Sequence, residues 1–389
     1  MSLRETTPRH SLRRRHLLRL ALAAPLASSL PRQLTAQEQR IRLIVRGERP
    51  LNAETPVSVF DRLLTPTESF FVRSHFRPPA VGLRPWVVRV EGLVERPFQI
   101  NLKELDTLRL EPSSIVAVLQ CAGNGRAFFE PVVPGVPWRK GAVGCAEWSG
   151  VRLADLIRHA GLQPQAAHVH TLTADIPPHP QTPPFLRSIP LDRALHPSTL
   201  LATHINGEPL PAIHGGPLRL IVPGWTGNHW IKWIRGLVVS SEEAPGFYQQ
   251  TAYRMPLHPV PPGTNPPPDQ LVPVTELNIK SLFARPEDGA IIASGRQRLV
   301  GAAWSGFTPV ERVEISINRG PWTPAQLGPA ASPFAWRIWQ HEWDPTPGHH
   351  ELAVRATDAH GTTQPESTPW NKSGYLWNGI DRVRVEVRA

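Results

Sequence analysis

Apolar and polar positions are arranged differently in the two halves of the chain. In the first half, residues 114–119 and 220–222 form largely apolar runs typical of buried strands, and residues 86–92 alternate as a half-buried strand does. Residues 148–157 lead into a short helix that should end near Gly161. These elements predict an α+β fold that begins with a mixed domain of strands and short helices.

After residue 255 the pattern changes. Eight prolines fall within residues 256–273, which predicts a stiff connector without regular structure. Beyond it, turn residues separate short alternating segments at the spacing of a sandwich, over residues 298–304, 310–317, 351–356 and 383–387. We therefore expect an immunoglobulin-like β-sandwich over residues 275–389.

The patterns predict four consecutive segments. A leader over residues 1–36 precedes the mixed α/β domain (37–255), the proline-rich linker (256–274) and the sandwich (275–389). Residues 37–70 show little regular pattern, so we expect them to wrap the surface of the first domain. With 389 residues and 40% hydrophobic content, the chain is long enough to bury two cores.

The charge distribution argues against a nucleic-acid-binding protein. The formal net charge is +10, but residues 1–36 carry seven arginines and one glutamate, so +6 of it belongs to the leader. A domain that tracks phosphates concentrates basic charge in its folded part. No nucleic-acid partner is therefore expected.

The leader has the layout of a signal peptide. Arg13-Arg14-Arg15-His16-Leu17-Leu18 precedes a short apolar run that reaches Leu30, with small residues near Ala36. Paired arginines before leucines resemble a twin-arginine signal, which exports folded proteins to the periplasm. No stretch is long and apolar enough for a membrane span. An amphipathic or disordered basic tail is the alternative interpretation.

Two cysteines occur, Cys121 and Cys145. Cys121 ends a predicted core strand at a Gly-Asn-Gly turn, a position suited to a metal ligand or a nucleophile, whereas an exported protein could also pair the two thiols in a disulfide. There is no C-x-x-C-H motif, so no covalent c-type haem is expected on this chain. Motifs for an ordinary zinc site are also missing.

The turn after Cys121 is not a dinucleotide fingerprint. Gly123-Asn124-Gly125-Arg126 follows a strand, but the third glycine is missing and Pro131 interrupts the helix that the motif requires. We therefore exclude a Rossmann domain.

Cationic residues next to glycines indicate an anion site. Arg73 and His75 are two apart on an extended segment and point the same way. His214, Arg219 and Lys232 accompany glycines that permit close backbone approach, as a phosphate-bearing cofactor requires. Taken alone, Arg73 and His75 would by default be a surface pair, and the other three residues could equally belong to a solvated loop region.

Four motifs precede the predicted sandwich in a fixed order. They are Phe71-Val72-Arg73-Ser74-His75, Cys121-Ala122-Gly123-Asn124, His214-Gly215-Gly216-Pro217-Leu218-Arg219 and Trp230-Ile231-Lys232-Trp233. In this order they resemble the sulfite oxidase family, and the resemblance continues through the sandwich. It implies a sulfite-oxidase-type molybdopterin domain followed by an immunoglobulin-like dimerisation domain.

The resemblance also implies residue roles. Family members bind molybdenum through a pterin dithiolene and one cysteine, and Cys121 matches that ligand. Arg73 and Arg126 match arginines that hold the substrate anion, and Tyr253 matches a tyrosine that can relay a proton. The positions that match the cofactor-binding set are Phe71, Val72, Arg73, Ser74, His75, Cys121, Asp175, His214, Arg219, Trp230, Ile231 and Lys232.

The implied activity is oxygen-atom transfer to sulfite or a related small sulfur oxyanion. Because the chain carries no haem motif, an external c-type cytochrome is the expected electron acceptor. The resemblance further implies a homodimer formed through the sandwich.

Three positions depart from the better-known members. Gly125 stands where an arginine is found, Pro134 replaces a pocket lysine of the animal enzymes, and Ser373 replaces one of their arginines. Three cations are thus missing around the expected substrate site.

Other interpretations remain open. A sulfane dehydrogenase-like subunit acting on carrier-bound sulfur fits a less cationic pocket, and the segment Arg187-Ser188-Ile189-Pro190-Leu191 suits that branch. A reductase of oxidised methionine is disfavoured by the sandwich. In a different class, the chain could be a metal-free exported scaffold with a Cys121–Cys145 disulfide.

Overall fold

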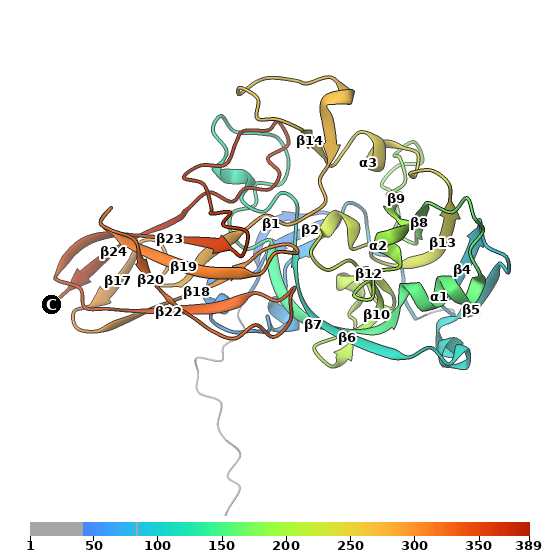
Figure 1. The fold of residues 1–389 in the computed structure, drawn as a ribbon, viewed down its shortest axis with the longest axis horizontal. Helices are drawn as coiled ribbons and strands as arrows, with labels where there is room; N and C mark the ends of the chain where they lie inside the picture. Colours follow the sequence, from blue (N-terminus) through green and yellow to red (C-terminus); the bar gives the residue numbers. More distant parts are fainter. Residues whose placement is uncertain (1–41, 83–84) are drawn as a thin grey trace, which may run out of the picture. The chain divides into compact units, whose positions relative to one another are not determined.

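The computed structural model describes residues 42–82 and 85–389, and the predicted leader lies outside the described residues. Figure 1 shows a first domain of mixed strands and short helices, followed along the chain by a β-sandwich. The predicted fold class is confirmed. In the described part of the chain, no helix is long and apolar enough to cross a membrane.

Two five-stranded sheets form the centre of the first domain. One has the order β11-β10-β7-β6, with β12 beside β10, and the other has the order β5-β4-β13-β8-β9. The bounds of the first are β6 (Pro112–Gln120), β7 (Val143–Arg152), β10 (Leu200–Ile205), β11 (Glu208–Pro209) and β12 (Arg219–Ile221). Those of the second are β4 (Val87–Gly92), β5 (Phe98–Asn101), β8 (His168–Thr173), β9 (Arg187–Pro190) and β13 (Ile234–Ser240).

The main core lies between these sheets and helix α1 (Leu153–Ala160). Leu153, Leu156, Ile157 and Ala160 repeat at helical spacing, and all are buried in the cluster that also holds the inner faces of both sheets. The helix is capped at its C-terminus by Gly161, whose φ of 73° lies in the left-handed region. The predicted end of the helix is therefore confirmed.

Short elements connect the sheets. The remaining α-helices are α2 (Leu191–Ala194) and α3 (Phe247–Gln250), and the 3-10 turns are η2 (Val57–Asp61), η3 (Thr67–Ser69), η4 (Leu102–Leu108), η5 (Arg126–Phe128), η6 (Ala212–His214), η7 (Gly227–His229) and η8 (Pro268–Gln270). The segment expected to wrap the surface, residues 37–70, instead contributes β1 (Ile44–Glu48) and β2 (Leu51–Glu54), which form a sheet with β3 (Val72–Arg73) just beyond it. Their short strands give too little alternation for sequence reasoning to detect.

The proline-rich segment is not an unstructured connector throughout. β14 (Arg254–Pro256) pairs with β15 (Leu271–Pro273) in a two-stranded sheet. Proline lacks a backbone donor but can occupy an edge position, and Pro256 and Pro273 both lie at strand ends.

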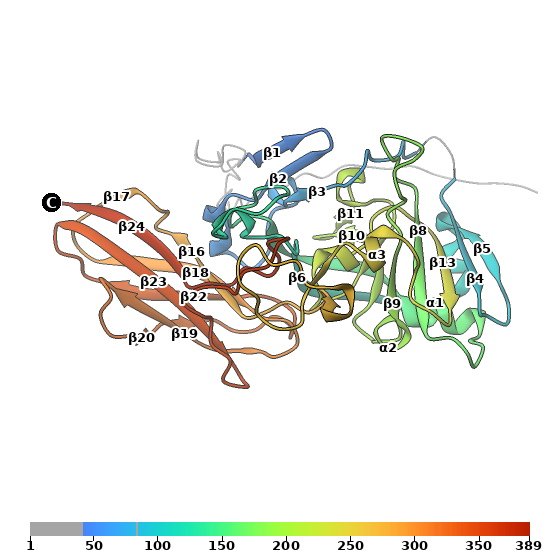
Figure 2. The ribbon, with the colours of Figure 1, turned by 90° about the horizontal axis from the view of Figure 1, so that it is seen from above.

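The sandwich consists of two sheets of four and five strands (Figure 2). One has the order β16-β18-β22-β21 and the other β17-β24-β23-β19-β20. The bounds are β16 (Lys280–Arg285), β17 (Ala290–Ala293), β18 (Gln297–Trp304), β19 (Val310–Ile317), β20 (Thr323–Pro324), β21 (Gln326–Leu327), β22 (Arg337–Trp343), β23 (Gly348–Asp358) and β24 (Asp381–Arg388).

A separate buried cluster joins the sandwich to the first domain. Val118 and Cys145 of the β6–β7 pair pack there with Trp304 and Trp336 of the sandwich. The Trp304 indole nitrogen also donates to the Gln120 side-chain oxygen at 3.0 Å. Because Gln120 immediately precedes Cys121, the sandwich contacts the strand end at which the candidate ligand sits.

Near this junction Lys280 is fully buried without a hydrogen-bond partner among the described residues. Its ammonium lies 4.7 Å from the centre of the Trp377 ring. Burial lowers the pKa of Lys280 to about 7, although nearby Asp381 acts in the opposite direction. Asp381 itself pairs with Lys140 at 2.6 Å.

Replacing Lys280 by methionine should stabilise the fold at neutral and lower pH. The unfolded chain keeps this proton up to a pKa of 10.5, whereas the folded chain releases it near 7, so this group makes wild-type stability rise with pH across that interval. The gain in unfolding free energy from Lys280→Met, on the order of 1–4 kcal/mol at pH 6, should therefore shrink towards pH 10, and the rise in Tm with it. Thermal unfolding at several pH values measures it. Lys103→Met, on the surface, is the control, and a Tm difference independent of pH would contradict the prediction.

Candidate functional site

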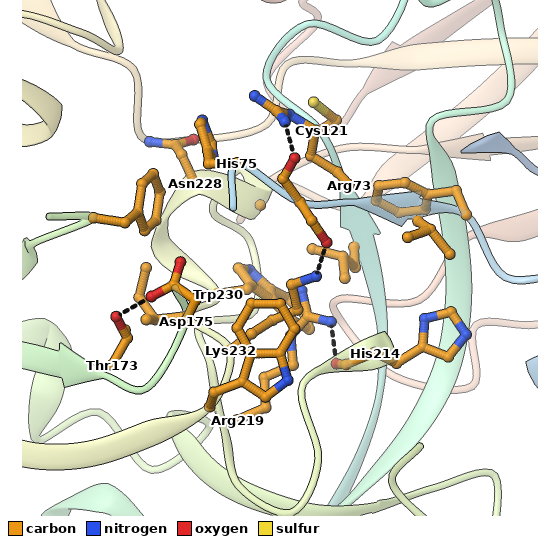
Figure 3. A pocket seen from close by; sticks show the side chains of 18 of the residues that line it. Arg73, His75, Cys121, Thr173, Asp175, His214, Arg219, Asn228, Trp230 and Lys232 are labelled. Atoms are coloured by element: carbon orange, nitrogen blue, oxygen red, sulfur yellow. Dashed lines mark hydrogen bonds between the residues drawn. The ribbon is translucent and has the colours of Figure 1, made fainter. Parts of the chain in front are cut away.

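A cavity in the first domain collects residues from all four sequence motifs (Figure 3). Segments far apart in the chain meet there because β3, the end of β6 and the segments after β8, η6 and η7 converge. The lining comprises Phe71, Val72, Arg73, Ser74, His75, Leu119, Cys121, Ala122, Thr173, Asp175, Phe185, Ile213, His214, Arg219, Gly227, Asn228, Trp230, Ile231, Lys232, Trp233 and Tyr253.

Cys121 lines this cavity at the end of strand β6. Its backbone N–H donates to Ala142 and its carbonyl accepts from Asn124, which fix the turn that carries it. Asn124 in turn accepts the Ala142 N–H through its side chain at 3.1 Å. Both cysteines are free, so the structure contains no Cys121–Cys145 disulfide. Cys145 is fully buried, and burial raises the pKa of its thiol to about 12, which makes it chemically inert.

The side of the cavity away from Cys121 is cationic (Figure 3). Lys232 donates to the Ser74 hydroxyl at 2.6 Å and to the Ile213 carbonyl at 3.2 Å. Arg219 donates to the His214 carbonyl at 2.8 Å, while its Nε has no partner among the described residues. In that same part of the chain no carboxylate forms an ion pair with either cation.

Burial makes the charged forms of Arg219 and Lys232 energetically unfavourable. It lowers the pKa of Arg219 to about 9 and that of Lys232 well below its ordinary value, with mutual repulsion adding to the effect on Lys232. The pKa of His214 falls to about 3 for the same reason, so His214 is neutral and serves as a hydrogen-bonding group. Cations removed from water without an anionic partner are stabilised by binding an anion. The site therefore fits an anionic group that carries a phosphate at this side and presents a soft metal to Cys121.

Asp175 lies at the edge of the cationic side. Its carboxylate accepts a hydrogen bond from the Thr173 hydroxyl, and burial raises its pKa. Lys232 pulls that pKa downward, so the two groups are electrostatically coupled without forming an ion pair. A carboxylate here can accept hydrogen bonds from the N–H groups of a bound heterocycle.

His75 and Tyr253 form a polar pair beside Cys121. The Tyr253 hydroxyl and the His75 Nε2 share a hydrogen bond of 2.7 Å. Burial raises the pKa of Tyr253, and burial followed by repulsion from Arg73 lowers that of His75. Both groups are thus uncharged at neutral pH, and the phenol keeps a proton that can be relayed.

Arg73 lines the cavity, whereas Arg126 lies behind the Cys121 turn. Arg126 donates through Nε to the Ser373 carbonyl at 2.8 Å and through Nη1 to the Val136 carbonyl at 3.0 Å. Gly123 gives it room, because a Cβ there would stand 2.4 Å from the guanidinium. Two of the three predicted catalytic residues, Arg73 and Tyr253, therefore line the cavity, and Arg126 is not among the lining residues.

At two of the three departures from the better-known members, Gly125 and Ser373, other groups occupy the site. Gly125 has a φ of 94°, and a Cβ there would lie 2.6 Å from the Trp377 ring, so an aromatic side chain takes the space of the missing arginine. Ser373 contributes its backbone carbonyl to Arg126 instead of a second guanidinium. Aromatic and backbone groups thus replace charge on this side.

Sequence reasoning missed two residues near Tyr253. Tyr375, from the segment before β24, stacks on the Tyr253 ring with centroids 5.5 Å apart and planes 18° apart. Arg187, on β9, is buried, and its guanidinium lies 5.5 Å from the centre of the same ring. Arg187 stands inside a motif noted for another reason, and Tyr375 is among only three tyrosines in the chain.

Comparisons with known proteins agree with the architecture. A family model described as "Oxidoreductase molybdopterin binding domain" matches residues 75–248, and one described as "Mo-co oxidoreductase dimerisation domain" matches residues 272–388. Together they cover most of the cavity lining, including Cys121, and the sandwich.

Curated relatives align over most of the chain. Sulfite oxidase of Gallus gallus is 35% identical over 356 residues, covering 86% of this chain and 76% of the relative. The mitochondrial sulfite oxidase of Mus musculus is 36% identical, covering 89% of this chain and 66% of its own length, so the chain spans just under two thirds of that protein. Sulfite oxidase of Arabidopsis thaliana is 31% identical, with 89% of this chain and 94% of the relative covered.

Among solved structures, sulfane dehydrogenase SoxCD from Paracoccus pantotrophus superposes with a TM-score of 0.76. It covers 95% of this chain and 98% of that chain at 24% identity, a likeness that shows the shared fold. Both family models and the curated relatives converge on one assignment. The chain belongs to the sulfite oxidase family of molybdopterin-dependent oxidoreductases.

Proposed function

We propose that the chain binds a molybdenum cofactor and oxidises sulfite or a related small sulfur oxyanion by oxygen-atom transfer. The observation that carries this proposal is the polarity of the cavity. A thiol at Cys121 lies on one side, and the buried Arg219 and half-buried Lys232, which form no ion pair with a carboxylate of the described residues, lie on the other. A molybdopterin has the same polarity, with a phosphate distant from its metal. When bound, it would supply the two-electron chemistry that side chains cannot.

The residues of this chain have separable tasks in the proposal. Cys121 ligates the metal, and Arg219, Lys232 and His214 hold the phosphate-bearing part. Arg73 and Arg126 orient the anion, since guanidinium groups match oxyanions in geometry and charge. Tyr253 holds a proton next to the reacting atoms, and its hydrogen bond to His75 fixes the hydroxyl.

The proposal extends to the protein's surroundings. We infer that the leader exports the folded protein to the periplasm, that an external c-type cytochrome accepts the electrons, and that the C-terminal domain forms a homodimer. The description of the matched dimerisation domain and the leader's paired arginines support these inferences. Cell fractionation and light scattering test location and dimer, since a cytoplasmic or monomeric protein would contradict them.

A second candidate is oxidation of sulfur on a carrier protein, as in a sulfane dehydrogenase-like subunit. It is favoured by the replacement of charge by aromatic and backbone groups around Gly125 and Ser373. Fewer cations reduce attraction for a free dianion and suit a tethered, less charged substrate.

Sulfite-dependent reduction of cytochrome c distinguishes these candidates. Protein expressed in a host that makes the cofactor should contain stoichiometric molybdenum and reduce cytochrome c when sulfite is added. A protein that contains molybdenum but does not oxidise sulfite would support the second candidate, oxidation of carrier-bound sulfur. A protein that remains free of molybdenum in such a host would contradict both.

Cys121→Ser should abolish activity and lower the molybdenum content, because an alcohol is a poor ligand where a soft thiolate is required. Cys145→Ser is the matched control, since this thiol is buried at the domain junction and lies outside the cavity. Metal analysis and sulfite oxidation are measured for both proteins. Loss of molybdenum from the Cys145 variant alone would show that the ligand assignment is wrong.

Tyr253→Phe should slow turnover roughly 10²-fold while leaving the molybdenum content intact, because it removes a proton donor but no metal ligand. Steady-state kinetics with parallel metal analysis provide the measurement. Tyr248→Phe is a suitable control, since that ring packs near His75 without a hydrogen bond from its hydroxyl in the described residues. Metal loss in Tyr253→Phe would count against a catalytic role.

A further inference from the structure

The C-terminal domain contributes the wall behind the Cys121 turn. The Leu376 N–H donates to the Ala122 carbonyl at 2.8 Å, so the segment is fastened to the residue next to the candidate ligand. Asn371 closes the segment on itself by accepting from the Tyr375 N–H and donating to its carbonyl. This loop, residues 371–376, is held at both ends and presents Tyr375 towards Tyr253.

Tyr375 contacts Tyr253 in two ways. The rings stack with centroids 5.5 Å apart, and both belong to one buried cluster with Ala122 and Val274. Burial raises the pKa of the Tyr375 phenol, while Arg126, the Tyr253 backbone and the Ser373 side chain act in the opposite direction. Tyr253 has a φ of 57°, a backbone conformation that a non-glycine residue keeps only when its surroundings enforce it.

The same loop holds Arg126. The Ser373 carbonyl accepts from Arg126 Nε, and the guanidinium lies 5.6 Å from the centre of the Tyr375 ring. A cation over an aromatic face is attracted by the ring's quadrupole, which favours the arginine rotamer that places the guanidinium there. One tyrosine therefore touches both an expected substrate-binding residue and the expected proton donor.

We propose that Tyr375 is a positioning residue of the oxidoreductase site, which holds the Tyr253 phenol and the Arg126 guanidinium in their working orientations from the C-terminal domain. The role rests on the proposed function for its kinetic consequence, but its geometric consequence is independent of substrate. It also gives the sandwich a part in the site beyond assembly. The phenol lies outside the lining of the cavity itself, so Tyr375 acts through its neighbours and does not touch the substrate.

Two substitutions separate its ring from its hydroxyl. Tyr375→Leu removes both the aromatic ring and the hydroxyl. It should lower kcat about tenfold and raise KM about tenfold, with the molybdenum content unchanged. Tyr375→Phe keeps the stack and should retain most of the activity. Val383→Ala, in the sandwich core, is the matched control, because it lowers Tm without touching either catalytic group.

A second measurement does not depend on turnover. The chain has three tyrosines, so protein labelled with 3-fluorotyrosine gives a simple ¹⁹F NMR spectrum. In Tyr375→Leu the Tyr253 resonance should shift and broaden, while Val383→Ala should leave it in place. An unchanged Tyr253 resonance together with wild-type kcat and KM in Tyr375→Leu would overturn the proposal. Lack of sulfite oxidation by the wild-type protein would instead refute the proposed function, and the NMR comparison would still decide the role of Tyr375.

Discussion

Unpaired buried positive charge is the constraint on which the site depends. Arg219 is buried and Lys232 half-buried, and among the described residues their hydrogen bonds go to backbone carbonyls and a serine hydroxyl rather than to a carboxylate. Burial depresses the pKa of each. A fold tolerates such an arrangement when the cations receive an anion. The cavity is therefore shaped electrostatically for a phosphate-bearing group, and the position of Cys121 on its other side gives that group an orientation.

Residues from both domains determine how the bound group is oriented. The first domain supplies the thiol, the cations and the Tyr253–His75 pair, while the sandwich supplies the loop that backs the Cys121 turn. The Trp304–Gln120 hydrogen bond fixes the end of β6 from the same direction. A change in the sandwich can therefore alter the site without contacting the cavity, because the two cores meet at the strand that carries Cys121.

The region around Arg126 shows how charge can be exchanged for packing. Trp377 fills the space at Gly125, and the Ser373 carbonyl takes one of the guanidinium donors. These contacts hold a single arginine firmly where the better-known members of the family use several cations. The resulting wall is more aromatic and less charged, which bears directly on the substrate that the site attracts.

Much of this could be read from the order of residues alone. Local sequence patterns predicted the strand before Cys121, the helix ending at Gly161, the alternating strands of the sandwich and the motifs that line the cavity. Such patterns are visible in the sequence because they involve neighbouring residues. Other features could not be predicted, because each depends on contacts between segments that are distant in sequence. They are the pairing of β14 with β15, the position of Arg126 behind the Cys121 turn, and the contacts of Tyr375 and Arg187 with Tyr253. The sequence by itself determined which chemistry is available, and the tertiary structure decided which side chains meet, because burial and contact exist only once the chain has folded.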